Sequence, residues 1–182
     1  MKVFQSPALR ILALVYGLTF AAGLPFAAPD RLVLGAVLMP ALVWLSLIDL
    51  ARHEIPDWAT ASIALVGLGF QWHLHGPGPE FWTTVLVALV LTATLWTIGA
   101  WFFHRNGTEA LGIGDAKLIG AGTLCVGAGA VWLLLFVGAT GGIAAGLMAR
   151  QRDATSAAQG LAFGPFLAYA IFLIVIFPSL DL

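Results

Sequence analysis

The sequence predicts an all-α polytopic membrane protein, a bundle of about seven transmembrane helices that forms one domain over residues 1–182. Two features of the composition predict it, since 60% of the residues are hydrophobic and only 9% are charged. At a mean hydropathy of +0.98, the apolar surface exceeds what a water-soluble core can bury, so a lipid bilayer must cover the rest. The net charge of -1 offers no basic surface for nucleic acid. The single cysteine, Cys125, allows neither an internal disulfide nor a four-cysteine zinc site.

Each predicted helix is an apolar run, because a helix crosses the hydrocarbon layer in about 20 residues. We expect helices at residues 8–26, 32–50, 57–74, 81–103, 112–126, 129–149 and 161–178. The first run follows two cations, as in a signal peptide. It is long, however, and Phe26 interrupts the A-x-A cleavage pattern, so we expect a retained helix. In the second run, Pro40 can be accommodated where neighbouring helices satisfy the backbone.

Local markers support the third to sixth helices. Tryptophans flank the third and fourth, as expected at two headgroup layers: Trp58, Trp72, Trp82 and Trp101. A Gly-Pro-Gly-Pro stretch at 76–79 predicts the tight turn between these two helices. The fifth run is the shortest and carries Asp115 and Lys117, so it is expected to start at the membrane surface. Glycines every four residues in the sixth run, at 138, 142 and 146, predict close helix packing.

The cations predict the orientation in the membrane. If successive helices alternate in direction, the amino-terminal face receives every cation except Arg31. These cations are Lys2, Arg10, Arg52, Arg105, Lys117, Arg150 and Arg152. The positive-inside rule then places the amino terminus in the cytoplasm and the carboxyl terminus outside.

Two acids are not explained by predicted loops. The others fall in or beside loops, where water solvates them: Asp30, Glu54, Asp57, Glu80, Glu109, Asp153 and Asp181. Asp49 ends the second helix and Asp115 begins the fifth, both on the predicted cytoplasmic face. A carboxylate in a membrane helix costs roughly 2.5–3.5 kcal/mol at the centre and less near an end, which makes it a functional candidate. The alternative is an ordinary acid at a helix end, favoured by the dipole.

Paired carboxyl groups suit acid–base chemistry. A few ångströms apart, both cannot be ionised cheaply, so the pair shares a proton. The charged group can activate water while the neutral one protonates the carbonyl or the leaving amine, as in aspartic peptidases. Gly112 and Gly114 leave the backbone beside Asp115 open to a substrate chain or another helix. We therefore expect Asp49 and Asp115 to act together, with no metal and no cofactor.

Three stretches carry motifs. IDLARHEIPDWAT sets an aspartate before an Ile-Pro-Asp sequence, at Asp49, Ile55, Pro56 and Asp57. LGIGDAKLIGAG contains GxGDxKL, at Gly112, Gly114, Asp115, Lys117 and Leu118. LAFGPFLAYA contains FGP at Phe163, Gly164 and Pro165, preceded by Ala162. In this order and spacing they resemble the type IV prepilin peptidases (prepilin leader peptidases), membrane aspartic peptidases of the GxGD type. The resemblance covers about 40–178, which leaves 1–30 as an additional transmembrane helix.

The resemblance implies an endopeptidase that cuts the basic leader from type IV prepilins or pilin-like secretion proteins. The reaction would occur at the cytoplasmic face of the bacterial inner membrane, so the partners would be these substrates and the bilayer. Asp49 and Asp115 would be catalytic, with Gly112, Gly114, Lys117, Pro56 and Asp57 as motif or substrate-contacting residues. Bifunctional members of the family also methylate the new amino terminus, and they carry a domain with paired CxxC motifs. A chain with one cysteine predicts a short form that cleaves without methylating. Ala162 stands where the family often has a proline.

Several alternatives stay open from the sequence. Asp57 is a rival for the role of Asp49, although after Pro56 it fits the first turn of the third helix, where the dipole favours an acid. Lys117 lies two residues from Asp115 and would point elsewhere, to lipid headgroups or to substrate. The alternative functions are a small proton-coupled transporter and a non-catalytic scaffold of a pilus or secretion machine. A transporter predicts acids spread through the membrane depth, whereas here they cluster on one face.

Overall fold

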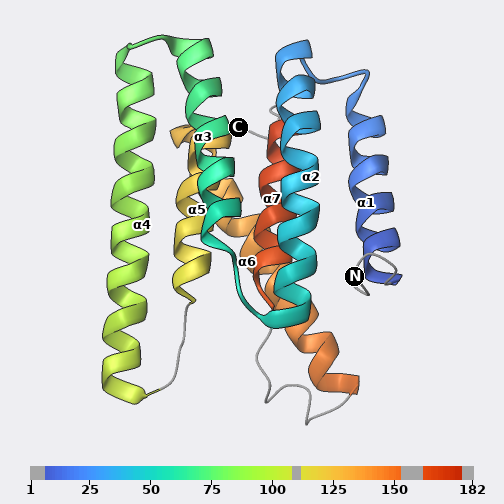
Figure 1. The fold of residues 1–182 in the computed structure, drawn as a ribbon, viewed down its shortest axis with the longest axis vertical. Coiled ribbons are helices and arrows are strands. Elements are labelled where there is room, and N and C mark those ends of the chain that lie inside the picture. The colour runs from blue at the N-terminus through green and yellow to red at the C-terminus, as the bar shows by residue number, and fades with distance from the viewer. Residues whose placement is uncertain (1–6, 108–111, 153–161, 178–182) are drawn as a thin grey trace.

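The computed structural model describes residues 7–107, 112–152 and 162–177. Helices and their connections make up this part of the chain, which contains no strand. In order, the helices are α1 (Pro7–Gly23), α2 (Pro29–Arg52), α3 (Asp57–His75), α4 (Pro79–Asn106), α5 (Ile113–Val126), the 3-10 helix η2 (Ala128–Ala130), α6 (Val131–Arg152) and α7 (Gly164–Ile176). The predicted all-α bundle is confirmed (Figure 1).

Three helical segments of the described part are long and apolar enough to cross a membrane: Pro29–Arg52, Pro79–Asn106 and Ala128–Met148. α1 and α7 are shorter apolar helices. The observed boundaries depart from the prediction mainly at prolines and glycines. α2 and α4 start a few residues early, at Pro29 and Pro79, because proline is preorganised for the first turn and lacks only an N–H that would be unpaired there. α4 continues to Asn106, where the left-handed Gly107 ends it.

Successive helices alternate in direction (Figure 1). The end of α2 and the starts of α3, α5 and α7 therefore lie at one end of the bundle, here called the site end. The opposite end, where α2 and α4 start and α3 ends, is the far end. This alternation puts most described cations toward the site end and Arg31 at the far end. Four residues of the charge pattern, Lys2, Glu109, Asp153 and Asp181, lie outside the described residues.

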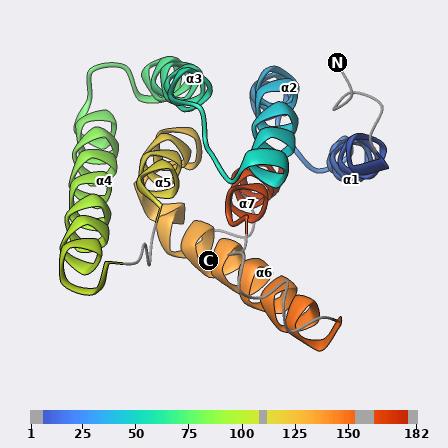
Figure 2. The same ribbon diagram turned by 60° about the horizontal axis from the view of Figure 1, so that its bottom comes forward.

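α7 is the central helix of the bundle, between α2 and α6 in Figure 2, and it also contacts α1 and α5. Most of its residues are buried. Glycines of α6 make room for it: a Cβ at Gly138 would lie 2.7 Å from Leu167 Cδ2, and one at Gly142 would lie 2.5 Å from Phe163 Cε2. The close packing expected from the glycines of the sixth helix is thus confirmed at these two positions.

A glycine of α3 controls how closely α3 and α5 approach. A Cβ at Gly67 would lie 2.8 Å from the backbone nitrogen of Cys125 and 2.8 Å from the carbonyl carbon of Leu124. Gly69 lies two residues further along the same helix, and its Cβ position has nothing within 4 Å. Backbone atoms cannot move aside as a flexible side chain can, so the two glycines differ sharply in what a methyl group would meet.

This difference predicts unequal effects of the same substitution. Gly67→Ala is expected to lower the free energy of unfolding by about 1–3 kcal/mol through overpacking. Gly69→Ala is the matched control and is expected to be neutral or stabilising, because alanine is the better helix former. Thermal unfolding of both variants in the same detergent measures the effect. Equal melting temperatures for the two variants would contradict the close α3–α5 packing.

Candidate active site

The last turn of α2 places Asp49 at the site end, where its side chain is buried at 4% exposure. The helix ends at His53, whose left-handed φ of 55° lets its backbone N–H bond to the Asp49 carbonyl oxygen at 2.8 Å. The chain then crosses the site end as Glu54, Ile55 and Pro56 before α3 begins. Pro56 is the N-cap of α3, directly before its first helical residue, Asp57.

The start of α5 presents Asp115 to the same region. Gly112 is the N-cap of α5, and Asp115 is its third helical residue. The Asp115 carboxylate lies beside the backbone N–H of Gly112. In a capping box, the side chain of the third helical residue makes this contact with the N-cap N–H. Its Oδ1 atom is buried and has no hydrogen-bond partner among the described residues. A buried oxygen of this kind is a place for a shared proton or an ordered water molecule.

Neither glycine of the GxGD motif has room for a side chain. A Cβ at Gly112 would lie 3.0 Å from Asp115 Oδ2, and one at Gly114 would lie 2.8 Å from Cβ of Ile55. The sequence predicted that another segment could approach here, and that segment is the connection between α2 and α3. The missing side chain at Gly114 thus lets the two motif-bearing segments pack directly against each other.

The start of α7 completes the site. The backbone N–H of Gly164 donates a hydrogen bond to Asp49 Oδ2 at 3.0 Å, across 115 residues of sequence. A Cβ at Gly164 would lie 2.8 Å from that oxygen. Sequence reasoning quoted Gly164 only as part of a motif and assigned it no role. The sequence signal that could have indicated this role is the Gly164–Pro165 pair at a helix start. Backbone N–H groups there lack partners within the helix and are free to bond to a side chain.

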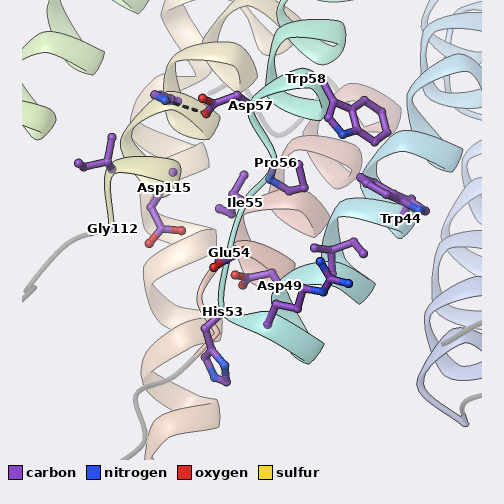
Figure 3. A pocket seen from close by; sticks show the side chains of 15 residues that line it. Trp44, Asp49, His53, Glu54, Ile55, Pro56, Asp57, Trp58, Gly112 and Asp115 are labelled. Carbon is purple, nitrogen blue, oxygen red and sulfur yellow. Dashed lines mark hydrogen bonds and ion pairs between the residues drawn. The ribbon is translucent and has the colours of Figure 1, made fainter. Parts of the chain in front are cut away.

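These segments surround an open pocket of about 750 Å³. Asp49 and Asp115, from two helices, both line it (Figure 3). Its other charged side chains are Arg52, Glu54, Asp57 and Lys117. Trp44 and Trp58 form one wall, with ring centroids 4.3 Å apart. The structure therefore brings the two carboxyl groups, which are 66 residues apart in the sequence, to one accessible space.

The sequence model of the type IV leader peptidase family matches residues 36–148. This range contains Asp49, the connection to α3 and the whole of α5. The chain belongs to the type IV leader peptidase family. The match begins within α2, so α1 precedes it.

Relatives of this leader peptidase family member carry the name prepilin leader peptidase/N-methyltransferase. One from Pectobacterium carotovorum subsp. carotovorum is 33% identical over 165 residues, which is 90% of this chain and 57% of the relative. One from Burkholderia pseudomallei (strain K96243) is 32% identical over 87% of this chain and 51% of its own length. One from Neisseria gonorrhoeae is 30% identical over 73% and 44%. The chain thus spans about half the length of these relatives. No solved structure matches it.

Asp57 and Lys117 pair with each other in this leader peptidase family member. Lys117 Nζ lies 2.7 Å from Asp57 Oδ1, and the side chains are 42% and 78% exposed. Lys117 therefore points away from Asp115, as its spacing predicts, and within the described residues its ion pair is with an acid of α3. In Figure 3 the Asp57 carboxylate does not point toward Asp49 or Asp115, and the dashed line that reaches it marks its ion pair with Lys117. This geometry favours Asp49 over Asp57 as the partner of Asp115.

Proposed function

We propose that this protein is an aspartic endopeptidase that removes the basic leader peptide from type IV prepilins or pilin-like secretion proteins. The observation that carries the proposal is that Asp49 and Asp115 open into one pocket from separate helices. Membership of the type IV leader peptidase family supports the substrate class, as do relatives named prepilin leader peptidases.

In the proposed reaction, a water molecule held between Asp49 and Asp115 attacks the carbonyl carbon of the scissile peptide bond. One carboxylate takes the proton from the water, and the other carboxyl group protonates the carbonyl oxygen. Collapse of the tetrahedral intermediate breaks the C–N bond, and a carboxyl group gives a proton to the leaving amine. The hydrogen bond from Gly164 to Asp49 Oδ2 holds that carboxyl group in a defined orientation while this occurs.

The charges of the side chains that line the pocket favour the binding of a basic substrate segment. Asp57 is paired with Lys117, which leaves Asp49, Glu54 and Asp115 against Arg52 among the lining side chains other than histidine. Lysine or arginine side chains of a leader would be attracted to this excess of acids. We place the pocket at the cytoplasmic face, because most cations lie toward the site end and positive loops stay in the cytoplasm.

A reconstitution experiment tests the proposal. The purified protein is mixed in detergent with a prepilin, and mass spectrometry locates the new amino terminus. We expect one cut directly after the leader, and much slower cutting of a prepilin whose leader lysines and arginines are replaced by glutamine. An intact prepilin after prolonged incubation, with proton flux through protein-containing liposomes, would instead favour the transporter. An intact prepilin without flux would favour the scaffold.

The same assay separates Asp57 from the proposed catalytic pair. Asp57→Asn is expected to change the cleavage rate by no more than a few-fold, because an exposed ion pair contributes only about 0.2–1 kcal/mol. Lys117→Gln breaks the same ion pair from its other side and is expected to match it. A loss of cleavage in Asp57→Asn as large as that in Asp115→Asn would make Asp57 the second catalytic acid.

A further inference from the structure

A second pocket lies at the far end of the bundle, away from the proposed catalytic pair. Its volume is about 320 Å³, within the range of small-molecule sites. The start of α2, the end of α3, the start of α4 and the chain after α5 contribute to its walls. Its polar side chains are Arg31, Gln71, His75, Glu80, Thr83 and Thr84. The proposed peptidase reaction uses none of them.

Two residues of this far-end pocket have buried polar atoms that find no partner among the residues that the structure describes. Arg31 Nη1 and Gln71 Oε1 make no hydrogen bond to any described residue. Gln71 is only 3% exposed, so its amide oxygen has lost water without gaining a donor from the described part of the chain. Arg31 stacks on Phe70, with its guanidinium carbon 5.6 Å from the ring centroid. Buried polar groups are rarely left unpaired, so a ligand that offers both an acceptor and a donor would complete the site.

The remaining polar groups restrict the ligand further. Glu80 Oε2 lies 2.6 Å from His75 Nδ1 and is on a side chain that is 75% exposed. Thr83 and Thr84 are already engaged, with the Pro79 carbonyl and the Ala128 N–H. The pocket thus combines one arginine with two oxygen acceptors, those of Gln71 and Glu80. This arrangement is complementary to a small group that carries both a negative charge and an ammonium.

The position of the pocket indicates where such a group comes from. Trp72 and Trp82 lie next to its lining residues in the chain and are 53% and 59% exposed. Exposed tryptophans at helix ends mark the headgroup layer of a bilayer. An apolar groove of about 360 Å³ between α2 and α3 includes Phe70, the ring on which Arg31 stacks. An acyl chain in this groove would lie next to a headgroup held by Arg31.

We propose that the far-end pocket binds the aminoethyl phosphate headgroup of a phospholipid. The Arg31 guanidinium donates to the phosphate, a charge-assisted contact suited to a buried site. Gln71 Oε1 and the Glu80 carboxylate accept hydrogen bonds from the primary ammonium. A lipid held in this way would join α2, α3 and α4 at the far end of the bundle.

Lipid binding to the full chain in detergent tests this proposal. Affinities are measured for dioctanoyl phosphatidylethanolamine and for dioctanoyl phosphatidylcholine, whose methylated ammonium cannot donate a hydrogen bond. We expect wild type to prefer the ethanolamine lipid about tenfold, the effect of a hydrogen bond to a charged group. Arg31→Gln should weaken both lipids, and Glu80→Gln should reduce the preference. Arg105→Gln is the matched control, since Arg105 also stacks on a ring, that of Trp101 at 5.5 Å, but lies toward the site end.

Three results would overturn the proposal. One is equal affinity of wild type for the two lipids, and another is a preference for the ethanolamine lipid that is as large in Glu80→Gln as in wild type. Because Glu80 is exposed, this variant decides the outcome even if Arg31→Gln does not fold. The third is binding of free O-phosphoethanolamine as tight as that of the lipid, which would assign the pocket to a soluble phosphoester.

Discussion

Asp49→Asn and Asp115→Asn are each expected to reduce kcat/KM for prepilin cleavage by roughly 10³-fold or more. Asparagine keeps the shape of the side chain but can neither take a proton from water nor give one to the leaving amine. Because the two groups act as one unit, the double variant should be little worse than either single variant. Timed cleavage assays with mass-spectrometric quantification of the product measure these losses.

Asp30→Asn is the matched control for these variants. Asp30 lies in the first turn of α2, and Asp49 lies in the last turn of the same helix. Both substitutions remove one carboxylate from α2, but Asp30 is at the far end, away from the pocket. We expect Asp30→Asn to cleave at the wild-type rate. Substantial cleavage by Asp49→Asn or by Asp115→Asn, in folded protein, would contradict the aspartic mechanism.

Gly164→Ala is expected to lower kcat for cleavage by about 10²-fold, the effect of displacing a reacting group by an ångström. The new Cβ would lie 2.8 Å from Asp49 Oδ2 and 3.0 Å from its Cγ, with Ile55 Cδ1 at 3.2 Å. The carboxylate therefore has to move away from the Gly164 N–H that orients it. Since the substitution repositions Asp49 without removing it, KM should change less than kcat.

Gly138→Ala is the control for packing around α7. Its Cβ would lie 2.7 Å from Leu167 Cδ2, the end of a flexible side chain that can rotate away, and it does not reach Asp49. This variant should retain most of its activity, with a melting temperature at or slightly below that of wild type. Wild-type kcat in a folded Gly164→Ala variant would show that the contact with Asp49 does not position the carboxylate.

Hydropathy and spacing were enough to predict each helix of the bundle, because an apolar run of sufficient length has to form a helix in a bilayer. Charge spacing was enough to single out Asp49 and Asp115, since both sit at helix ends on one predicted face. The helix boundaries were less predictable. They depend on local capping, as at Pro79 and Gly107 of α4.

Contacts across the site could not be derived in the same way. The hydrogen bond from Gly164 to Asp49 spans 115 residues, and the ion pair from Lys117 to Asp57 spans 60. The spacing of Lys117 predicted that it points away from Asp115, but not that it meets Asp57. The contact of Ile55 with Gly114 likewise could not be predicted from the sequence, because it depends on the relative placement of two separate segments.

By itself, the sequence determined that the chain is a helical membrane protein and that two acids, Asp49 and Asp115, are not explained by predicted loops. The tertiary structure decided what surrounds those acids, and that Arg31, Gln71 and Glu80 share a second pocket at the far end. The physical reason is range. Helix formation and membrane insertion depend on neighbours within a turn or a span. The contacts around Asp49 and Asp115, in contrast, depend on how α2, α5 and α7 pack against their neighbours. Small residues such as Gly138 and Gly164 permit this packing.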